Sequence, residues 1–214
     1  AKKTDDGWVI NGTKRFITNG GWADWYLIFA RTSPDRFGIF LVNKTDKGVS
    51  FGPGERKMGL RGSPTCDVIL DDCVIPEDRV IGDPGEGGTY IRAGLLASRL
   101  KYAAHGLGIA QGALDEALAY TRTREQFGRP IADFQMSKGM VADMAMRVEA
   151  GRAVLLHAAT LAMNEAPDAK KYASMAKVLC TEAAVAVTRD ALQLHGGYGF
   201  MKDYPIERMY RDAK

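Results

Sequence analysis

The 214-residue sequence has few of the residues that build metal sites or disulfide frameworks. Its three cysteines form no CxxC pair and its three histidines show neither HxxxH nor HExxH spacing, so no metal site and no disulfide scaffold is predicted. Cys66 and Cys73 lie an odd number of positions apart on one expected strand and should face opposite sides of it. Reduced, structural thiols are therefore the favoured interpretation.

The sequence also lacks a strong charge of one sign and a long hydrophobic run. Lys and Arg total 29 against 26 Asp and Glu, and the net charge of +3 is spread along the chain. This charge is too weak and too even to indicate nucleic acid or an anionic membrane as a partner. No apolar run reaches the roughly 18 residues of a membrane span, and AKKTDDGWVINGTKRF contains no stretch typical of a secretion signal. We therefore expect a soluble protein whose partners are small molecules or other proteins.

Short β-rich runs are present from Trp8 to about Pro84. WVING, WYLIFART, FGIFLVNK and DVILDDCVIP are separated by turn sequences such as SPD, TDKG, GPG and GSP. This pattern predicts an antiparallel sheet or barrel. Within it, GWVINGTKRFITNG is typical of a hairpin whose type I′ turn is Asn11-Gly12.

Beyond IGDPGEGGTY the chain becomes rich in Ala, Leu and Met and poor in turn formers. The helical period predicts one long helix or two abutting helices over 91–124, and further helices over 134–164 and 167–195. Gly196-Gly197 would end the last helix in the manner of a glycine C-cap. The many alanines of this last helix would permit close approach of a neighbouring helix.

The second expected helix carries the apolar stripe of a bundle helix, because Val141, Val148 and Leu155 recur every seven residues. The predicted fold class is therefore α+β. An antiparallel β domain, a barrel or sandwich incomplete at its N-terminus, would occupy residues 1–86. An antiparallel helical bundle incomplete at its C-terminus would occupy residues 87–214.

The stretch YTRTREQFGRPIADFQ places Arg122, Arg124 and Arg129 around a helix end, with Phe127 between them. One interpretation is structural, since cations complement the negative end of a helix dipole and Gly128 can cap the helix. The alternative is that Arg124 binds a phosphate group while Phe127 covers a flat heterocycle.

Two other stretches leave a similar choice. The glycines of QLHGGYGF follow a helix rather than open one, which excludes a GxGxxG dinucleotide loop; they either stop the helix or expose backbone N–H groups to an anion or a flat ring. In KRFITNGG, Phe16 and Thr18 share one face of a strand, which either packs into the sheet or faces a ligand. No serine, cysteine or histidine has the neighbours of a nucleophilic triad.

Four stretches then point to one family. KRFITNGGWADW, KMGLRGSPTCDVILDDCVIPEDRVIG, TRTREQFGRPIADFQ and LQLHGGYGFMKDYPIERMYRDAK occur in the order and spacing of the acyl-CoA dehydrogenase family, which the sequence resembles over essentially all its residues. RGSPTCDVILDDCVIP is similar to isovaleryl-CoA dehydrogenase and other short- or branched-chain members. The resemblance implies a flavoenzyme of fatty acid β-oxidation or branched-chain amino acid catabolism. It would convert an acyl-CoA thioester to a trans-2-enoyl-CoA and pass electrons through FAD to electron transfer flavoprotein.

The resemblance also implies an FAD site built from three segments. Phe16, Ile17 and Thr18 would lie against the isoalloxazine, with Thr18 near the flavin N5; Phe16 replaces the family's usual tryptophan, which preserves stacking but loses an indole donor. An FAD clamp would comprise Arg124, Phe127 and Gln135. A loop that would receive the adenine dinucleotide of a neighbouring subunit would comprise Gln193, Leu194, His195, Gly196 and Gly197. The site would therefore span a dimer interface within a dimer-of-dimers tetramer.

By the same resemblance, Arg36, Tyr90 and Arg99 would contact acyl-CoA, the alternative being a surface role for the arginines and a core role for the tyrosine. The reaction needs a glutamate to take the α-proton. The family supplies it from one of two positions. One position is Ser98 here, which cannot act as a base at neutral pH, and the other lies just beyond Lys214.

No catalytic residue is thus expected in this chain. The resemblance implies a fragment that lacks an N-terminal domain and the C-terminal end, and for which no turnover is expected. Two alternatives stay open: an oxidase of the same fold, whose reduced flavin reacts with oxygen, and a non-catalytic dimerising module. A bacterial cytoplasm and a mitochondrial matrix are both compatible with the sequence.

Overall fold

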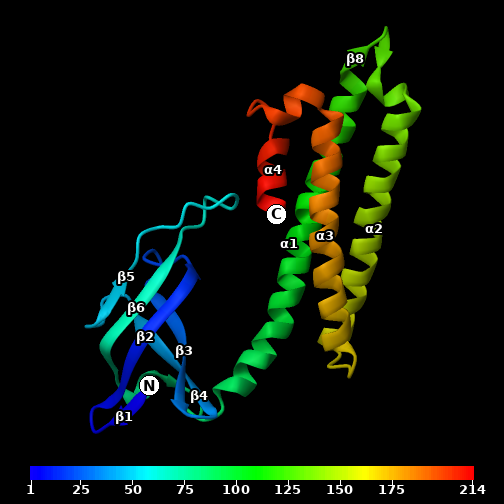
Figure 1. Ribbon diagram of the computed structural model, residues 1–214. Coiled ribbons are helices and arrows are strands. Elements are labelled where there is room, and N and C mark those ends of the chain that lie inside the picture. The colour runs from blue at the N-terminus through cyan, green and yellow to red at the C-terminus, as the bar shows by residue number, and fades with distance from the viewer. The chain divides into compact units, whose positions relative to one another are not determined.

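The computed structural model describes residues 1–214, which divide into two compact units, Ala1–Gly94 and Leu95–Lys214. Figure 1 shows a β unit followed by a unit of helices, as the α+β pattern predicts. The first long helix starts at Gly87, so its opening turns group with the strands. None of the helices combines the length and hydrophobicity needed to cross a bilayer.

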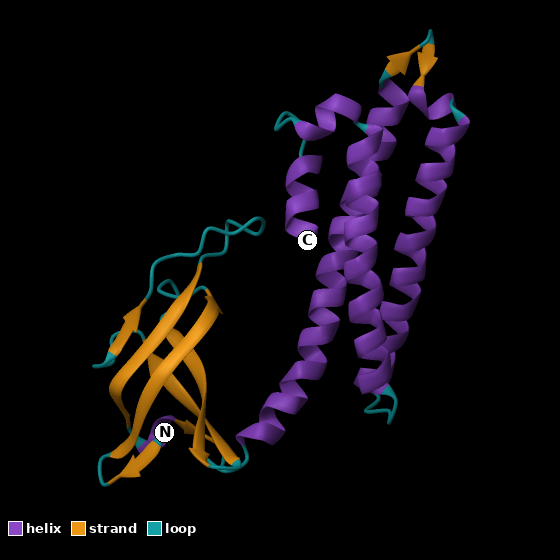
Figure 2. Cartoon of the chain, in the orientation of Figure 1, coloured by secondary structure: helices purple, strands orange, loops and turns teal.

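The first unit is antiparallel β structure (Figure 2). Two sheets, in the orders β1-β2-β6-β5 and β3-β4-β7, share one apolar core that includes Ile10, Ile28, Phe40 and Val68. The strands are β1 (Lys2–Thr4), β2 (Gly7–Thr18), β3 (Trp25–Ser33), β4 (Arg36–Asn43), β5 (Val49–Phe51), β6 (Thr65–Ile75) and β7 (Val80–Ile81), with the 3-10 turn η1 (Glu77–Arg79) before the last. In β3, alternate residues Tyr26, Ile28 and Ala30 are buried, as the period of two requires.

The expected hairpin turn at Asn11-Gly12 is wrong. Both residues lie inside the continuous strand β2, opposite a point where β6 carries one extra residue. The Asn11 side chain donates from Nδ2 to Asp72 Oδ1 at 2.9 Å and accepts the Asp72 backbone N–H at 2.7 Å. Asp72 itself adopts a left-handed backbone with φ 47. The Asn-Gly pair therefore serves a β-bulge, because a strand distant in sequence supplies its hydrogen bonds.

The same bulge corrects the expectation that Cys66 and Cys73 face opposite sides of their strand. The extra residue shifts the alternation by one position, so both side chains are buried, with exposed fractions of 3% and 0%. Cys180 in the helical unit is also buried, and all three thiols are free.

The second unit is a bundle of four helices, α1 (Gly87–Thr123), α2 (Gln135–Met163), α3 (Ala169–Leu194) and α4 (Ile206–Ala213). The helix expected over 91–124 is therefore a single one, and it ends at Thr123. The short hairpin β8 (Glu125–Gln126) and β9 (Arg129–Pro130), with the 3-10 turn η2 (Ile131–Asp133), joins α1 to α2. The 3-10 turn η3 (Gly196–Phe200) joins α3 to α4.

Small residues let the three long helices approach closely. A Cβ placed on Gly106 of α1 would lie 3.0 Å from the Cys180 carbonyl oxygen of α3, and one on Gly151 of α2 would lie 3.3 Å from the Cys180 Sγ. Val148 of the predicted α2 stripe is fully buried in this core, and so is Met144 of the same helix. As expected, alanines of α3 allow this close approach. Among the buried residues of α3 are Ala173, Ala176, Ala183, Ala184 and Ala191.

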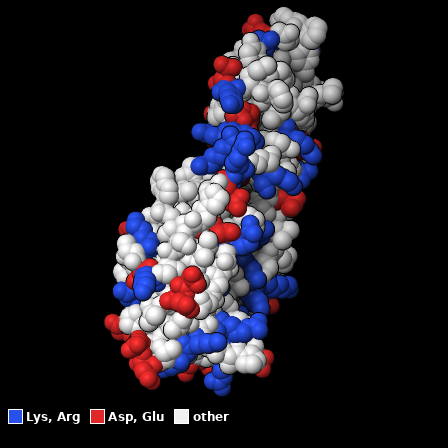
Figure 3. Space-filling model, turned by 60° about the vertical axis from the view of Figure 1, so that its left-hand side comes forward, with Lys and Arg blue, Asp and Glu red and all other residues white.

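Acidic and basic side chains are interspersed over the face that Figure 3 shows, apart from one local group of basic side chains. The mixture agrees with the small net charge of +3. The chain thus gives no indication, on this face, of a surface-wide field that would attract a polyanion.

Gly106→Ala should lower the free energy of unfolding by about 1–3 kcal/mol, because the added methyl meets the backbone of α3, which cannot rotate away. Gly108→Ala is the matched control in the same helix, since nothing lies within 4 Å of its Cβ position. There the helix propensity of alanine should stabilise by about 0.5–1 kcal/mol. Urea unfolding followed by helical circular dichroism measures both; equal effects would contradict the close α1–α3 contact.

The buried thiols should resist alkylation in the folded protein. Burial, followed by the nearby Asp46 carboxylate, raises the pKa of Cys73 to about 11, and burial also raises the pKa of Cys66 and Cys180. Because the thiolate is the reactive species, little labelling by iodoacetamide is expected at pH 8 until urea unfolds the chain. The folded thiol keeps its proton to higher pH than the unfolded one, so the contribution of Cys73 to stability should fall as pH rises from 9.0 towards 11. Rapid labelling of native protein at pH 8 would contradict this burial.

Candidate functional site

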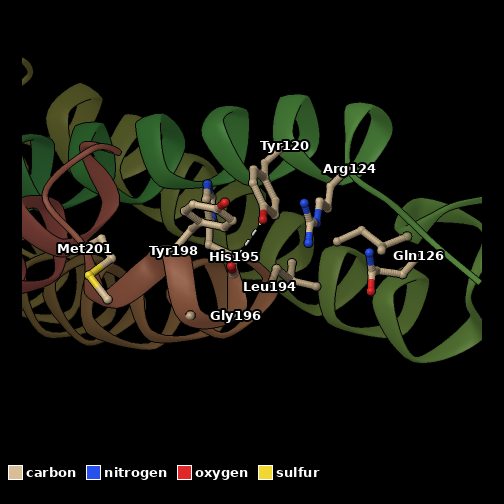
Figure 4. A pocket seen from close by; sticks show the side chains of 10 residues that line it. Tyr120, Arg124, Gln126, Leu194, His195, Gly196, Tyr198 and Met201 are labelled. Carbon is tan, nitrogen blue, oxygen red and sulfur yellow. Dashed lines mark hydrogen bonds between the residues drawn. The ribbon is translucent and has the colours of Figure 1, made fainter.

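A cavity of about 450 Å³ lies at the end of the bundle where α1 and α3 both terminate (Figure 4). It belongs entirely to the second unit. Three segments line it: the last turn of α1, the β8–β9 hairpin with the residue after it, and the end of α3 with η3. The lining residues are Tyr120, Arg124, Gln126, Ile131, Leu194, His195, Gly196, Gly197, Tyr198 and Met201.

The end of α1 turns sharply into the hairpin, and this turn places one cation at the cavity. Arg124 follows Tyr120 by one helical turn, and the N–H of Arg124 still donates to the Tyr120 carbonyl at 2.9 Å. The N–H of Ile131 donates to the Arg124 carbonyl at 2.8 Å and closes the hairpin. At the tip, Phe127 and Gly128 have φ values of 56 and 78, typical of a type I′ turn.

The other wall is the glycine run after α3. Gly196 has a left-handed backbone with φ 58 and ends the helix, as expected. Nothing lies within 4 Å of the Cβ positions of Gly196 or Gly197, so their backbone is open to an approaching group. Leu194 and His195, just before them, are buried, with exposed fractions of 8% and 2%.

A layer of aromatic rings supports the cavity. The His195 ring stacks on Tyr120 at 4.2 Å with an interplanar angle of 21° and meets the edge of Tyr204 at 5.3 Å. The Tyr120 hydroxyl donates to the His195 carbonyl at 3.3 Å, drawn as a dashed line in Figure 4. Burial raises the pKa of Tyr120 while Arg124 opposes this shift, and the protonated hydroxyl remains a donor. His195 Nδ1 bonds to the Ala191 carbonyl at 2.8 Å, which leaves the buried Nε2 without a partner.

Arg124 is the cation of the cavity, and no carboxylate pairs with it. Its guanidinium carbon lies 5.7 Å from the centre of the Tyr198 ring, and its side chain is exposed. A free guanidinium beside open glycine backbone and the exposed Tyr198 ring suits an anionic group joined to a flat ring system. The residues therefore fit a dinucleotide with a diphosphate. No group of three or more His, Cys, Asp or Glu residues is placed to hold a metal ion.

The structure brings Arg124, Leu194, His195, Gly196 and Gly197 of the predicted cofactor set together around this cavity. The other three residues of that set in this unit lie outside the lining. Phe127 stands at the hairpin tip, 93% exposed, with its ring 6.1 Å from Phe134. Gln135 is the first residue of α2, and Gln193 is an exposed residue of the last turn of α3.

Phe16, Ile17 and Thr18 end strand β2 in the first unit. The Phe16 side chain is 64% exposed and its backbone is left-handed, with φ 55. Ile17 is half-buried and pairs with Cys66, and Thr18 is exposed at the last pair of the strand, opposite Thr65. This segment offers an exposed ring and a hydroxyl rather than a buried strand face.

Two of the three predicted substrate residues also lie in the first unit. Arg36 starts β4 and is exposed, and Tyr90 lies in the first turns of α1 with its ring directly over Gly82. Arg99 lies further along α1, in the second unit. None of the three lines the cavity of about 390 Å³ in the first unit, whose lining includes Asp35 and Arg92.

Five lining residues are not predicted from the sequence: Tyr120, Gln126, Ile131, Tyr198 and Met201. Tyr120 was detectable, because it lies four positions before Arg124 on the same helix and hence on the same face. Tyr198 stands within the glycine run that had been singled out. The others follow only from the path of the hairpin and of η3.

Comparison with known proteins gives a consistent match along the chain. A model described as acyl-CoA dehydrogenase, middle domain, matches residues 1–73, and one described as acyl-CoA dehydrogenase, C-terminal domain, matches residues 85–214. The chain is 48% identical over 218 residues to an acyl-CoA dehydrogenase of Bacillus subtilis, covering 100% of this chain and 57% of that protein. It is 41% identical over 213 residues to the caffeyl-CoA reductase–Etf complex subunit CarC of Acetobacterium woodii, covering 98% of this chain and 56% of that protein.

Solved structures agree. Butyryl-CoA dehydrogenase from Megasphaera elsdenii superimposes with a TM-score of 0.95 at 37% identity, covering 99% of this chain and 56% of that one. The FAD complex of PigA superimposes with a TM-score of 0.94 at 30% identity, covering 100% and 56%. The chain thus spans about half the length of the relatives it matches.

Phe127→Asn should raise the free energy of unfolding by up to about 1 kcal/mol, because asparagine tolerates a left-handed backbone better than phenylalanine and Asn-Gly favours a type I′ turn. Phe127→Ala is the control: it also removes the exposed ring but has no preference for this conformation. Urea unfolding compares the two. An alanine variant as stable as the asparagine variant would mean that the turn is not strained.

Proposed function

Because the chain belongs to the acyl-CoA dehydrogenase family, we propose that the cavity between the ends of α1 and α3 binds the adenine diphosphate part of FAD. The observation that carries this proposal is the unpaired Arg124 beside the open backbone of Gly196 and Gly197. The guanidinium would bind diphosphate oxygens, and the absence of side chains on the glycines lets the phosphates reach backbone N–H groups.

The surrounding side chains would complete the site. Leu194 and the stacked His195 form an apolar floor on which a flat ring can rest. Phe127 is held on a strained turn with its ring in solvent, a position from which it can cover the cofactor of a neighbouring subunit. Gln135 and Gln193 would supply polar contacts from beyond the cavity wall. The exposed rim of the cavity is in keeping with a site shared between subunits of a dimer or tetramer.

The flavin end of the cofactor would rest on Phe16, Ile17 and Thr18. When bound, FAD would accept the hydride that leaves the β-carbon of an acyl-CoA thioester. Phe16 would stack on the ring system and Thr18 would offer a hydrogen-bond donor to it. The reaction would also need a carboxylate base for the α-proton.

The substrate and the electron acceptor complete the proposal. Arg36, Tyr90 and Arg99 would contact a short- or branched-chain acyl-CoA, with the arginines suited to its phosphates. The electrons would leave for electron transfer flavoprotein, in keeping with the Etf complex in which the CarC relative takes part. A bacterial cytoplasm or a mitochondrial matrix stays a prediction for its location.

Arg124→Ala should raise the dissociation constant for FAD by at least about tenfold, because a charge-assisted hydrogen bond contributes roughly 1.5–3 kcal/mol. Arg122→Ala is the matched control, since this arginine has the same charge and lies in the last turn of the same helix but outside the cavity lining. Titration of flavin fluorescence measures both, with gel filtration to record the oligomer. Wild-type protein that binds no FAD, or equal weakening by both variants, would overturn the proposal.

A further inference from the structure

The segment Phe16–Asn19 holds two non-glycine residues in left-handed conformations. Phe16 has φ 55 and Asn19 has φ 58, and they flank Ile17 and Thr18. Such a conformation costs a residue with a Cβ roughly 1–2 kcal/mol, and phenylalanine has no polar side chain to compensate locally. Contacts from elsewhere in the first unit must therefore hold the segment in place.

One end of the segment is a β-bulge. Strand β2 uses two residues, Arg15 and Phe16, where the partner strand β6 uses only Asp67. Asp67 Oδ1 accepts the Phe16 backbone N–H at 3.4 Å and lies 3.6 Å from Arg15 Nε. The Arg15 guanidinium carbon in turn lies 5.2 Å from the centre of the Phe16 ring. A single carboxylate oxygen, on a side chain only 22% exposed, thus contacts both bulged residues.

The other end is fixed independently. The N–H of Asn19 donates to the Pro64 carbonyl at 2.7 Å, and the Ser63 hydroxyl donates to Asn19 Oδ1 at 3.1 Å. The Tyr26 hydroxyl donates to the Asn19 carbonyl at 3.3 Å. The bulge at Phe16 is therefore the end of the segment whose conformation depends on a single side chain, that of Asp67.

We propose that Asp67 is a positioning residue that fixes the face of β2 on which the side chains of the segment 16–18 lie. Its role toward the cofactor rests on the proposed function of that segment. Without the carboxylate, the Phe16 N–H loses its acceptor and Arg15 loses its counter-charge. A bulge that relaxes by one residue moves every following side chain to the opposite face of the strand. Asp67 therefore acts through the backbone of Phe16, without contacting the ligand itself.

The test compares Asp67→Ala and Asp67→Asn with a control, Asp72→Asn, at the other bulge of the same strand pair. Backbone hydrogen exchange over residues 16–18 is measured first without FAD, and thermal unfolding confirms that each variant is folded. We expect Asp67→Ala to speed exchange in this segment about tenfold and Asp67→Asn, which keeps an acceptor, to have a smaller effect. Asp72→Asn should leave the segment unchanged. Unchanged exchange in folded Asp67→Ala would overturn the positioning role.

The second readout is the visible circular dichroism of FAD added to each protein, which reports the surroundings of the isoalloxazine. An altered spectrum in Asp67→Ala, partly restored in Asp67→Asn, supports the inference. Faster exchange with an unaltered spectrum would overturn the role toward the cofactor and leave Asp67 as a purely structural group. If wild-type protein binds no FAD, the proposed function fails together with that role, while the exchange result still decides what Asp67 does to the bulge.

Discussion

The close approach of helix backbones around Cys180 is the constraint on which the helical unit depends. Gly106 brings α1 against the α3 backbone at Cys180, and Gly151 brings α2 against the Cys180 side chain of the same turn. Close packing of this kind leaves little freedom in how the helices slide past one another. The ends of α1 and α3 are therefore fixed relative to each other. The shape of the cavity between those two ends depends on the contact of Gly106 with Cys180, several helical turns away.

Both segments proposed to meet the cofactor contain an aromatic residue with a left-handed backbone. Phe16 and Phe127 are exposed aromatic residues held in left-handed conformations, where glycine or asparagine would be more stable. Neither ring gains much from burial, since 64% and 93% of these side chains remain exposed. Local stability alone does not account for either residue, which is in keeping with the role toward a cofactor proposed for both rings.

Some arginines of the chain are held in ion pairs within the fold, whereas Arg124 is not. An Arg79 nitrogen lies 2.9 Å from an Asp46 carboxylate oxygen, and an Arg211 nitrogen lies 2.8 Å from a Glu207 carboxylate oxygen. Both arginines therefore form ion pairs within the chain. Arg124 has no such partner at the cavity. A guanidinium kept free beside open glycine backbone retains its capacity for an external anion, which a structural ion pair would have satisfied.

The sequence by itself determined the class of each half, because period two before Pro84 and a helical period after it depend only on which residues alternate. It also indicated Arg124 and the run Gln193–Gly197 as candidate cofactor residues, because a guanidinium and a glycine backbone have the same binding chemistry wherever they lie in a fold. Tertiary structure alone decided the rest. The Asn11-Gly12 pair became part of a bulge, and the parity of the two strand cysteines was reversed, because a partner strand distant in sequence carried an extra residue there. Likewise, only the meeting of two helix ends brought Tyr120 and Tyr198 to one cavity, since a local pattern does not specify which segments fold against each other.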